Sequence, residues 1–180
     1  MRTIQNYCET DLKTDILLKR NQKNVFQGIK IEKIILNFGV KEANFNLNKI
    51  LPPLLISKLL TQQQPVYTKA KKSIANFKLR AGKTIGCKVT LRGPLKNSFF
   101  EKFIHIVLPQ IIESKRISYK NRSPKNNLTF GIEDSNVFPE LENQYDLFPK
   151  ISGMEITIAS KEDKKSKDNL LFSGLKINFQ

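Results

Sequence analysis

The sequence contains few of the residues that enzymes and zinc proteins use at their functional centres. There is one histidine, His105, and there are two cysteines, Cys8 and Cys87, in 180 residues. The cysteines lie far apart and show no Cys-x-x-Cys or His-paired spacing, which argues against a zinc site and a disulfide framework and favours a reducing compartment. Motifs of phosphate-binding loops, dinucleotide-binding folds and zinc proteases are absent as well. We therefore expect no catalytic residue, no metal and no cofactor.

These few reactive side chains also have structural interpretations. His105 lies between two isoleucines of an apolar segment and is predicted to be a partly buried structural residue. Cys87 falls on the apolar side of an alternating strand and is predicted to be a small core residue. The carboxylates show no pairing that suggests acid–base catalysis.

Long apolar runs are absent too. No stretch approaches the ~18 residues that a membrane-spanning helix needs. The first 21 residues contain Glu9, Asp11 and Asp15, so they resemble neither the apolar core of a signal peptide nor an acid-poor transit peptide. We expect this segment to belong to the mature fold, and we expect no membrane partner.

Acidic residues are missing from the middle of the chain. Residues 43–100 contain eleven Lys or Arg and no Asp or Glu, and they supply most of the formal net charge of +15. A solubility device intersperses both signs of charge, whereas a block of one sign attracts a polyanion. Nucleic acid is the favoured partner on this evidence, with an anionic membrane or a plain solvated surface as alternatives.

The hydrophobic patterning predicts one α+β domain over residues 1–180, in which helices pack on one side of an antiparallel sheet. Two features interrupt the sheet: a long basic hairpin loop at 73–84, which protrudes, and a basic, turn-rich loop at 114–127. Helices are expected at 6–20, 52–61, 97–113 (kinked or ended at Pro109) and 160–172, and strands at 29–40, 65–73, 84–93, 128–132 and 151–160.

The stretch "TKAKKSIANFKLRAGKTIGCKVTLRG", residues 68–93, combines several ways to bind a nucleic acid, RNA in preference to DNA. Lysines at a strand end and on the loop can reach phosphates, and Phe77 at mid-loop can stack on a base. Phe77 and Leu79 packing back on the protein is the alternative. The alternation in "TIGCKVTLRG" puts Lys88, Thr90 and Arg92 on one face of a strand, where a hydroxyl and cations can contact phosphate and the ribose 2′-hydroxyl.

This stretch resembles the bacterial-type large-subunit ribosomal protein five family, whose motif runs close to "TKARKSxAGFKxRxGxPxGCKVTLRG". The resemblance extends to "EKIILNFGVKEA", "FFEKFIHIVLPQI", "FGIEDSNVFPEL" and "GMEITIAS", in the family's order and spacing, and so covers nearly the whole chain. It implies an α+β domain whose sheet face binds 5S rRNA in the central protuberance of the large ribosomal subunit. It also implies contacts with large-subunit rRNA and with other central protuberance proteins.

The resemblance assigns a role to each matching residue. The residues implied to bind 5S rRNA are Asn37, Gln63, Thr68, Lys69, Lys71, Lys72, Lys88, Thr90 and Arg92. The loop implied to reach the peptidyl-site tRNA consists of Ser73, Ile74, Ala75, Asn76, Phe77, Lys78, Leu79, Arg80, Ala81 and Gly82. Family members also touch small-subunit head protein thirteen, which forms a bridge between the subunits.

The chain departs from the family pattern at several positions. Asn76 stands where glycine is usual, Ala81 where a polar residue is usual, and Thr84 where proline is usual. Asn76 tolerates a left-handed backbone, so the loop is expected to be kept. Residues 113–131 lack the glycines of the family's corresponding loop, which puts the bridge contacts in question.

Composition suggests where the protein works. Lys outnumbers Arg by 25 to 6, and Ile, Asn and Phe are abundant, as expected from an AT-rich gene. We therefore expect a mitochondrial ribosomal protein encoded in the organelle, with a plastid or a bacterial cytoplasm as alternatives. The function predicted is non-catalytic support of translation, and the alternative is an RNA-binding protein or 5S rRNA carrier acting off the ribosome.

Overall fold

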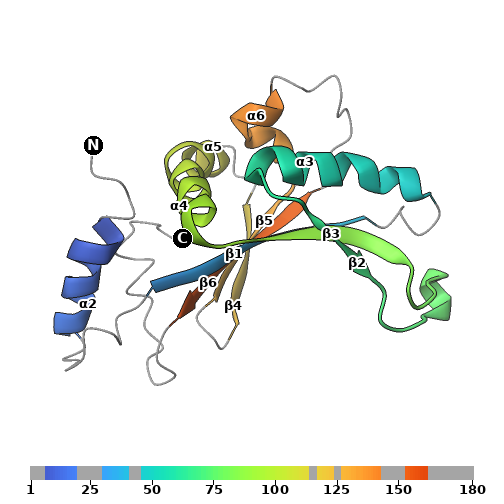
Figure 1. The fold of residues 1–180 in the computed structure, drawn as a ribbon, viewed down its shortest axis with the longest axis horizontal. Helices are drawn as coiled ribbons and strands as arrows, with labels where there is room; N and C mark the ends of the chain where they lie inside the picture. Colours follow the sequence, from blue (N-terminus) through green and yellow to red (C-terminus); the bar gives the residue numbers. More distant parts are fainter. Residues whose placement is uncertain are drawn as a thin grey trace.

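The structure, a computed structural model, describes residues 7–19, 30–40, 46–113, 117–123, 127–142 and 153–161. Its centre is a six-stranded antiparallel sheet with the strand order β2-β3-β1-β6-β5-β4 (Figure 1). The strands are β1 (Lys30–Gly39), β2 (Val66–Lys69), β3 (Thr84–Leu91), β4 (Ile117–Ser123), β5 (Asn127–Ile132) and β6 (Met154–Lys161).

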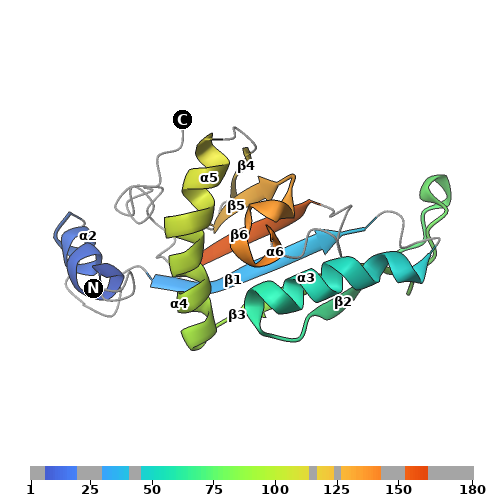
Figure 2. The same ribbon diagram turned by 90° about the horizontal axis from the view of Figure 1, so that it is seen from above.

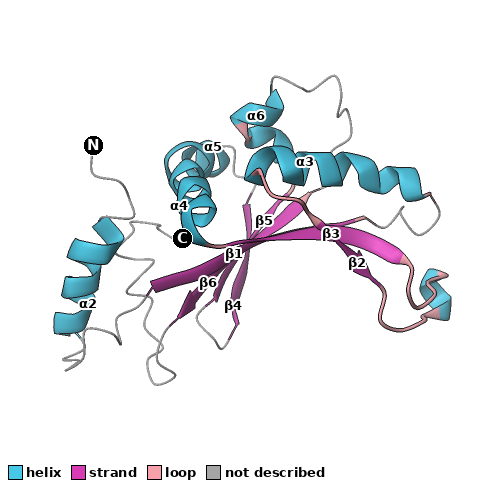
Figure 3. Cartoon of the chain, viewed as in Figure 1, coloured by secondary structure: helices cyan, strands magenta, loops and turns pink. Residues whose placement is uncertain are grey.

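The described helices that pack on this sheet lie on one of its faces, as the patterning predicts. They are α3 (Leu51–Thr61), α4 (Gly93–Lys102), α5 (Leu108–Glu113) and α6 (Pro139–Glu142), all on the same side in Figures 1 and 3. Seen from above, α3 runs along β2 and β3 while α4 and α5 cross the strands (Figure 2). A π-helical turn (Cys8–Leu12) and α2 (Lys13–Lys19) lie within the helix expected near the N-terminus.

The core lies between the sheet and these helices because each central strand alternates buried and accessible side chains. In β1 every second residue, Ile34, Leu36 and Phe38, is buried. Rings from the helices meet them: Phe103 packs on Phe130 of β5 with ring centroids 5.4 Å apart in a tilted arrangement. The apolar stripes of the helices and the apolar halves of the strands thus bury one another, and the second face of the sheet keeps the polar halves.

Some helix ends lie where the sequence predicts them, and others do not. Helix α3 has its prolines in the first turn and ends at Thr61, as predicted. Helix α4 begins at Gly93 and not at Asn97, because Pro94 fits the first turn and Gly93, at φ 58°, allows the chain to enter it. The helix also continues past Pro109 to Glu113, since a wide π-helical turn at Phe103–Val107 comes just before the proline.

Residues 117–123 of the basic segment 114–127 form a strand, so the prediction of a loop was wrong for this part. This strand, β4, pairs with β5 in a hairpin. The pairing places Tyr119 opposite Phe130, and β5 supplies the backbone hydrogen-bond partners of β4. The turn-rich composition of the segment does not reveal this pairing. The expected start of a helix at Ser160 was also wrong, because β6 continues to Lys161, and residues 162–172 lie outside the described residues.

None of the helices that the structure describes is both long enough and apolar enough to cross a bilayer.

Candidate nucleic-acid interface

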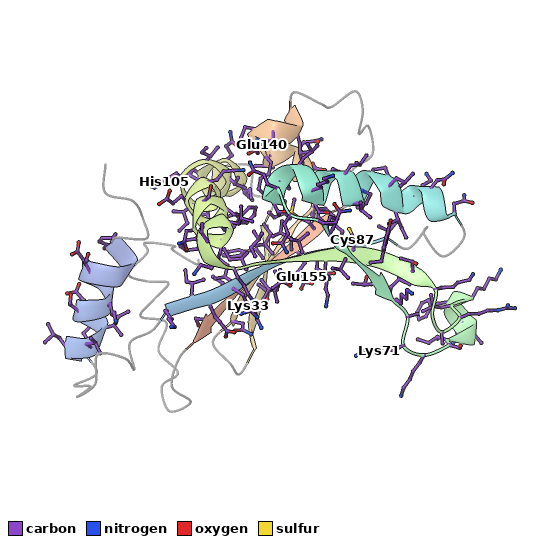
Figure 4. The ribbon with its side chains drawn as sticks, in the orientation of Figure 1. Lys33, Lys71, Cys87, His105, Glu140 and Glu155 are labelled. Carbon is purple, nitrogen blue, oxygen red and sulfur yellow. The ribbon has the colours of Figure 1, made fainter. Side chains whose placement is uncertain are left out.

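The face of the sheet opposite the helices, called the open face below, displays the polar halves of five strands. Strand register defines it, because residues paired across antiparallel strands point to the same side. Figure 4 shows Lys33 and Glu155 on this side and Cys87 on the helix side. The open face consists of Lys33, Ile35, Asn37, Gly39, Val66, Thr68, Gly86, Lys88, Thr90, Thr129, Gly131, Glu155, Thr157 and Ala159.

Four of the nine residues predicted to bind 5S rRNA, Asn37, Thr68, Lys88 and Thr90, meet on this face. Asn37 of β1 pairs with Lys88 of β3, and one row further Ile35 pairs with Thr90. Thr68 of β2 pairs with Gly86 of β3, on the open side. Residues that are far apart in the chain thereby become neighbours in adjacent strands, as an extended RNA-binding surface requires.

Arg92 follows β3 directly and occupies the N-cap position of helix α4. Its guanidinium donates to Glu32 over 3.5 Å, and both side chains are about half exposed. An ion pair at this exposure contributes at most ~1 kcal/mol to stability, so it leaves Arg92 able to exchange Glu32 for phosphate.

The other predicted contacts lie around this face. Lys69 ends β2, and Lys71 and Lys72 are exposed in the segment that follows it. Gln63 lies elsewhere, half-buried in the turn between α3 and β2, where its backbone N–H donates to the Thr61 hydroxyl over 3.3 Å. Gln63 is therefore not within the strand rows of the open face.

Residues 70–83, called the protruding loop below, extend from the β2–β3 end of the sheet (Figure 1). At the base, the Ala70 N–H donates to the Lys83 carbonyl over 2.8 Å and the Gly82 N–H to the Ala70 carbonyl over 2.9 Å. Further out, Ile74 and Leu79 exchange a pair of backbone hydrogen bonds, and the Ala81 N–H donates to the Ser73 hydroxyl over 2.9 Å. The loop is thus a small ordered hairpin, not an unstructured connection.

The tip of the protruding loop is a single 3-10 turn, Ala75–Phe77, closed by Lys78 in the left-handed conformation at φ 51°. Asn76, whose residue type tolerates a left-handed backbone, lies within the 3-10 turn, and the left-handed residue is Lys78. Phe77 is 72% exposed and only Leu79 is half-buried, so the interpretation in which both pack back on the protein fails for Phe77. The tip presents an aromatic ring among cations, which suits stacking on a base.

A close approach of backbones lies where the loop leaves the sheet. A Cβ added to Gly86 would lie 2.1 Å from the Phe38 carbonyl oxygen of β1, so only glycine fits there. Beside it, the β2–β3 register shifts by one residue between Thr68 and Lys69. Such a bulge bends a strand and increases its twist, and it directs the loop away from the plane of the sheet.

The two reactive side chains that the sequence singled out, Cys87 and His105, lie in different environments. Cys87 is buried in the core, as predicted, near the Ser57 hydroxyl at 3.9 Å, and burial raises the pKa of its thiol. His105 is exposed on the outer side of the helix, so the prediction of partial burial was wrong. Among the residues that the structure describes, no three His, Cys, Asp or Glu side chains gather where they could hold a metal.

Sequence reasoning missed the half of the open face that β5 and β6 contribute. Thr129 and Thr157 pair across these strands with their hydroxyl oxygens 3.2 Å apart, and Glu155 lies in the next row beside Asn37. The alternation of Met154, Ile156 and Ile158 was the available signal, because the residues between them must point to the other face.

Comparison with known proteins accounts for nearly the whole chain. The family described as "Ribosomal protein L5" matches residues 24–80, and the model of that ribosomal family's C-terminus matches residues 84–179. The chain is 41% identical over 177 residues to "Large ribosomal subunit protein uL5m" of Reclinomonas americana, covering 98% of this chain and 97% of that protein. It is 34% identical over 180 residues to "Large ribosomal subunit protein uL5" of Buchnera aphidicola, with 100% and 99% covered. The chain belongs to the ribosomal protein L5 family of the large ribosomal subunit.

Proposed function

We propose that this protein binds 5S rRNA through its open face and holds the protruding loop against the peptidyl-site tRNA in the mitochondrial large subunit. It is not an enzyme in this proposal, because it acts by neutralising charge and matching shape. The relative named uL5m supports the mitochondrial location. Residues 1–180 are proposed to act as one domain, since strands from both family-matched parts interleave in one sheet.

The observation that carries the proposal is the juxtaposition of Asn37, Lys88 and Thr90 in neighbouring strands on a face that the described helices leave uncovered. Amide, ammonium and hydroxyl groups at this spacing can contact bases, phosphates and 2′-hydroxyls together. Arg92 and the lysines at the end of β2 extend the cationic surface around it.

The loop has a separate role because it is a separate structural unit. Its own hydrogen bonds hold its shape, and its exposed aromatic tip lies beyond the strands of the sheet. A ring stacked on a base or sugar contributes ~1–3 kcal/mol, and the surrounding cations add sequence-independent attraction. This combination of stacking and sequence-independent attraction suits a tRNA that is recognised mainly by its shape.

Binding assays with purified 5S rRNA test the first role. Thr90→Val and Arg92→Ala should weaken binding, and affinity should fall by ~0.7–0.9 log units per log unit of salt for each phosphate neutralised. Asp15→Asn is a matched surface control, because Asp15 is exposed on α2. Unchanged affinity in both open-face variants would contradict this part of the proposal.

A loop variant tests the second role. Replacing residues 75–78 by Asn-Gly keeps the Ile74–Leu79 pair and closes it with a two-residue hairpin turn. We expect this variant to bind 5S rRNA normally and to weaken peptidyl-site tRNA binding in assembled ribosomes. An equal loss of 5S rRNA binding in the loop variant and in Arg92→Ala would refute the division of roles.

Two further contacts are part of the proposal. Large-subunit rRNA and neighbouring central protuberance proteins are expected around the open face, and small-subunit head protein thirteen is expected at an intersubunit bridge. If the protein instead acts off the ribosome as a 5S rRNA carrier, sedimentation of an extract will find it with free RNA and not with large subunits.

A further inference from the structure

Glu155 is an unexpected residue on the open face. Among the residues that define this face, it is the one carboxylate, and it is exposed near the middle of the sheet. A negative charge opposes the approach of phosphate, so a surface built only for the RNA backbone would not place it there.

Strand register gives Glu155 two specific neighbours. Asn37 lies between Lys88 of β3 on one side and Glu155 of β6 on the other. The Asn37 Nδ2 group donates to Glu155 Oε2 over 3.4 Å. Because a carboxylate only accepts hydrogen bonds, it selects the amide nitrogen of Asn37 and leaves the amide oxygen Oδ1 for another donor.

The charges along this row separate the open face into two halves. On the β3 side lie Lys88 and, one residue past the strand, Arg92. On the β6 and β5 side, Glu155 is followed by the hydroxyls of Thr157 and Thr129. The first half attracts phosphates, and the second offers acceptors and neutral hydroxyls that suit base edges.

We infer that Glu155 is a specificity-determining residue of this surface: its carboxylate accepts a hydrogen bond from an amino or imino N–H group of an unpaired rRNA base. Carboxylates recognise the cytosine amino group in this way, and proteins read RNA sequence mainly at such splayed bases. Glu155 also positions the Asn37 amide for the same base. The inference rests on the proposed function, because it assumes that the open face binds 5S rRNA.

The test compares Glu155→Gln and Glu155→Ala in the full chain, using a full-length 5S rRNA transcript from the organism that encodes it. Glutamine keeps an acceptor oxygen and loses the charge, whereas alanine loses both. We expect about tenfold weaker binding for Glu155→Ala, a smaller loss for Glu155→Gln, and an unchanged salt dependence. Asp15→Asn and Asp15→Ala remove the same charge from the exposed surface of α2 and are the matched controls.

Unchanged or tighter RNA binding by the Glu155 variants would overturn the inference. If Glu155 is only a tolerated like charge, both variants will bind as tightly as the Asp15 controls or more tightly. Chemical probing adds a second readout: the Glu155→Ala complex should expose a base N–H edge that the wild type protects, with backbone protection kept. Loss of backbone and base protection together would also count against it.

The two failures can be told apart. If the wild-type protein does not bind the 5S rRNA transcript, the proposed function itself fails. If it binds, and Arg92→Ala weakens binding while the Glu155 variants match their controls, only the assignment of Glu155 fails.

Discussion

Replacing Gly86 by alanine should destabilise the fold at the centre of the proposed interface. The new Cβ would lie 2.1 Å from the Phe38 carbonyl oxygen, whereas real Cβ contacts essentially never fall below 3.0 Å. Strands β1 and β3 would have to move apart by about 1 Å, which disrupts ladder hydrogen bonds such as the 2.9 Å bond from the Val40 N–H to the Ile85 carbonyl.

The size of the effect follows from these contacts. Two or three weakened hydrogen bonds at ~1 kcal/mol each give a loss of roughly 2–3 kcal/mol in the free energy of unfolding, similar to other overpacked sites. For a chain of this length, such a loss lowers Tm by roughly 4–12 °C.

Gly39→Ala is the matched control, since Gly39 pairs with Gly86 but a Cβ there meets nothing within 4 Å. Thermal unfolding followed by circular dichroism measures both variants, and we expect Gly39→Ala to stay within ~0.5 kcal/mol of the wild type. Equal Tm values for the two variants would refute the reasoning from the close approach.

The other predictions concern the core, the thiol and the ion pair. Phe130→Ala should cost about 3–5 kcal/mol in denaturant unfolding, because its ring is fully buried. In a Cys8→Ser background, Cys87 should resist a thiol reagent at pH 8 until the protein unfolds. Burial raises the pKa of the Cys87 thiol above its ordinary value of 9.0. Below pH 9 the thiol is protonated in both the folded and the unfolded chain, so its ionisation does not lower stability. Above pH 9 the unfolded chain ionises first and the free energy of unfolding falls, as unfolding at several pH values will show. Glu32→Gln should change stability by less than ~1 kcal/mol, since its pair with Arg92 is exposed; a larger change in urea unfolding would contradict this.

The sequence predicts the parts of this fold in which local pattern and tertiary burial agree. The alternation around Cys87 and Val89 correctly separates the two faces of β3, and the prolines of α3 correctly mark its first turn. The open face could be assembled from β1 and β3 because both strands carry their polar residues in the recognised motif.

The errors come from interactions between distant residues. The segment around Tyr119 looks like a loop because its polar residues favour turns, yet pairing with β5 makes it a strand. Pro109 is compatible with either a kink or an end of the helix; the helix has a π-helical turn just before the proline and continues to Glu113, a choice that the local sequence leaves open. Glu155 could be placed on the open face by its alternation, while its position beside Asn37 depends on the register of strands far apart in the sequence.

The shortness of β2 has a consequence for the protein before it meets RNA. β2 is one edge of the sheet, and an unpaired edge can recruit another chain and start aggregation. Here the edge is only four residues long, ends at Lys69 and is followed by the exposed Lys71 and Lys72. Repulsion between such charges on two copies discourages edge-to-edge pairing. The same lysines that are proposed to grip phosphates would thus keep newly made chains apart until RNA neutralises them.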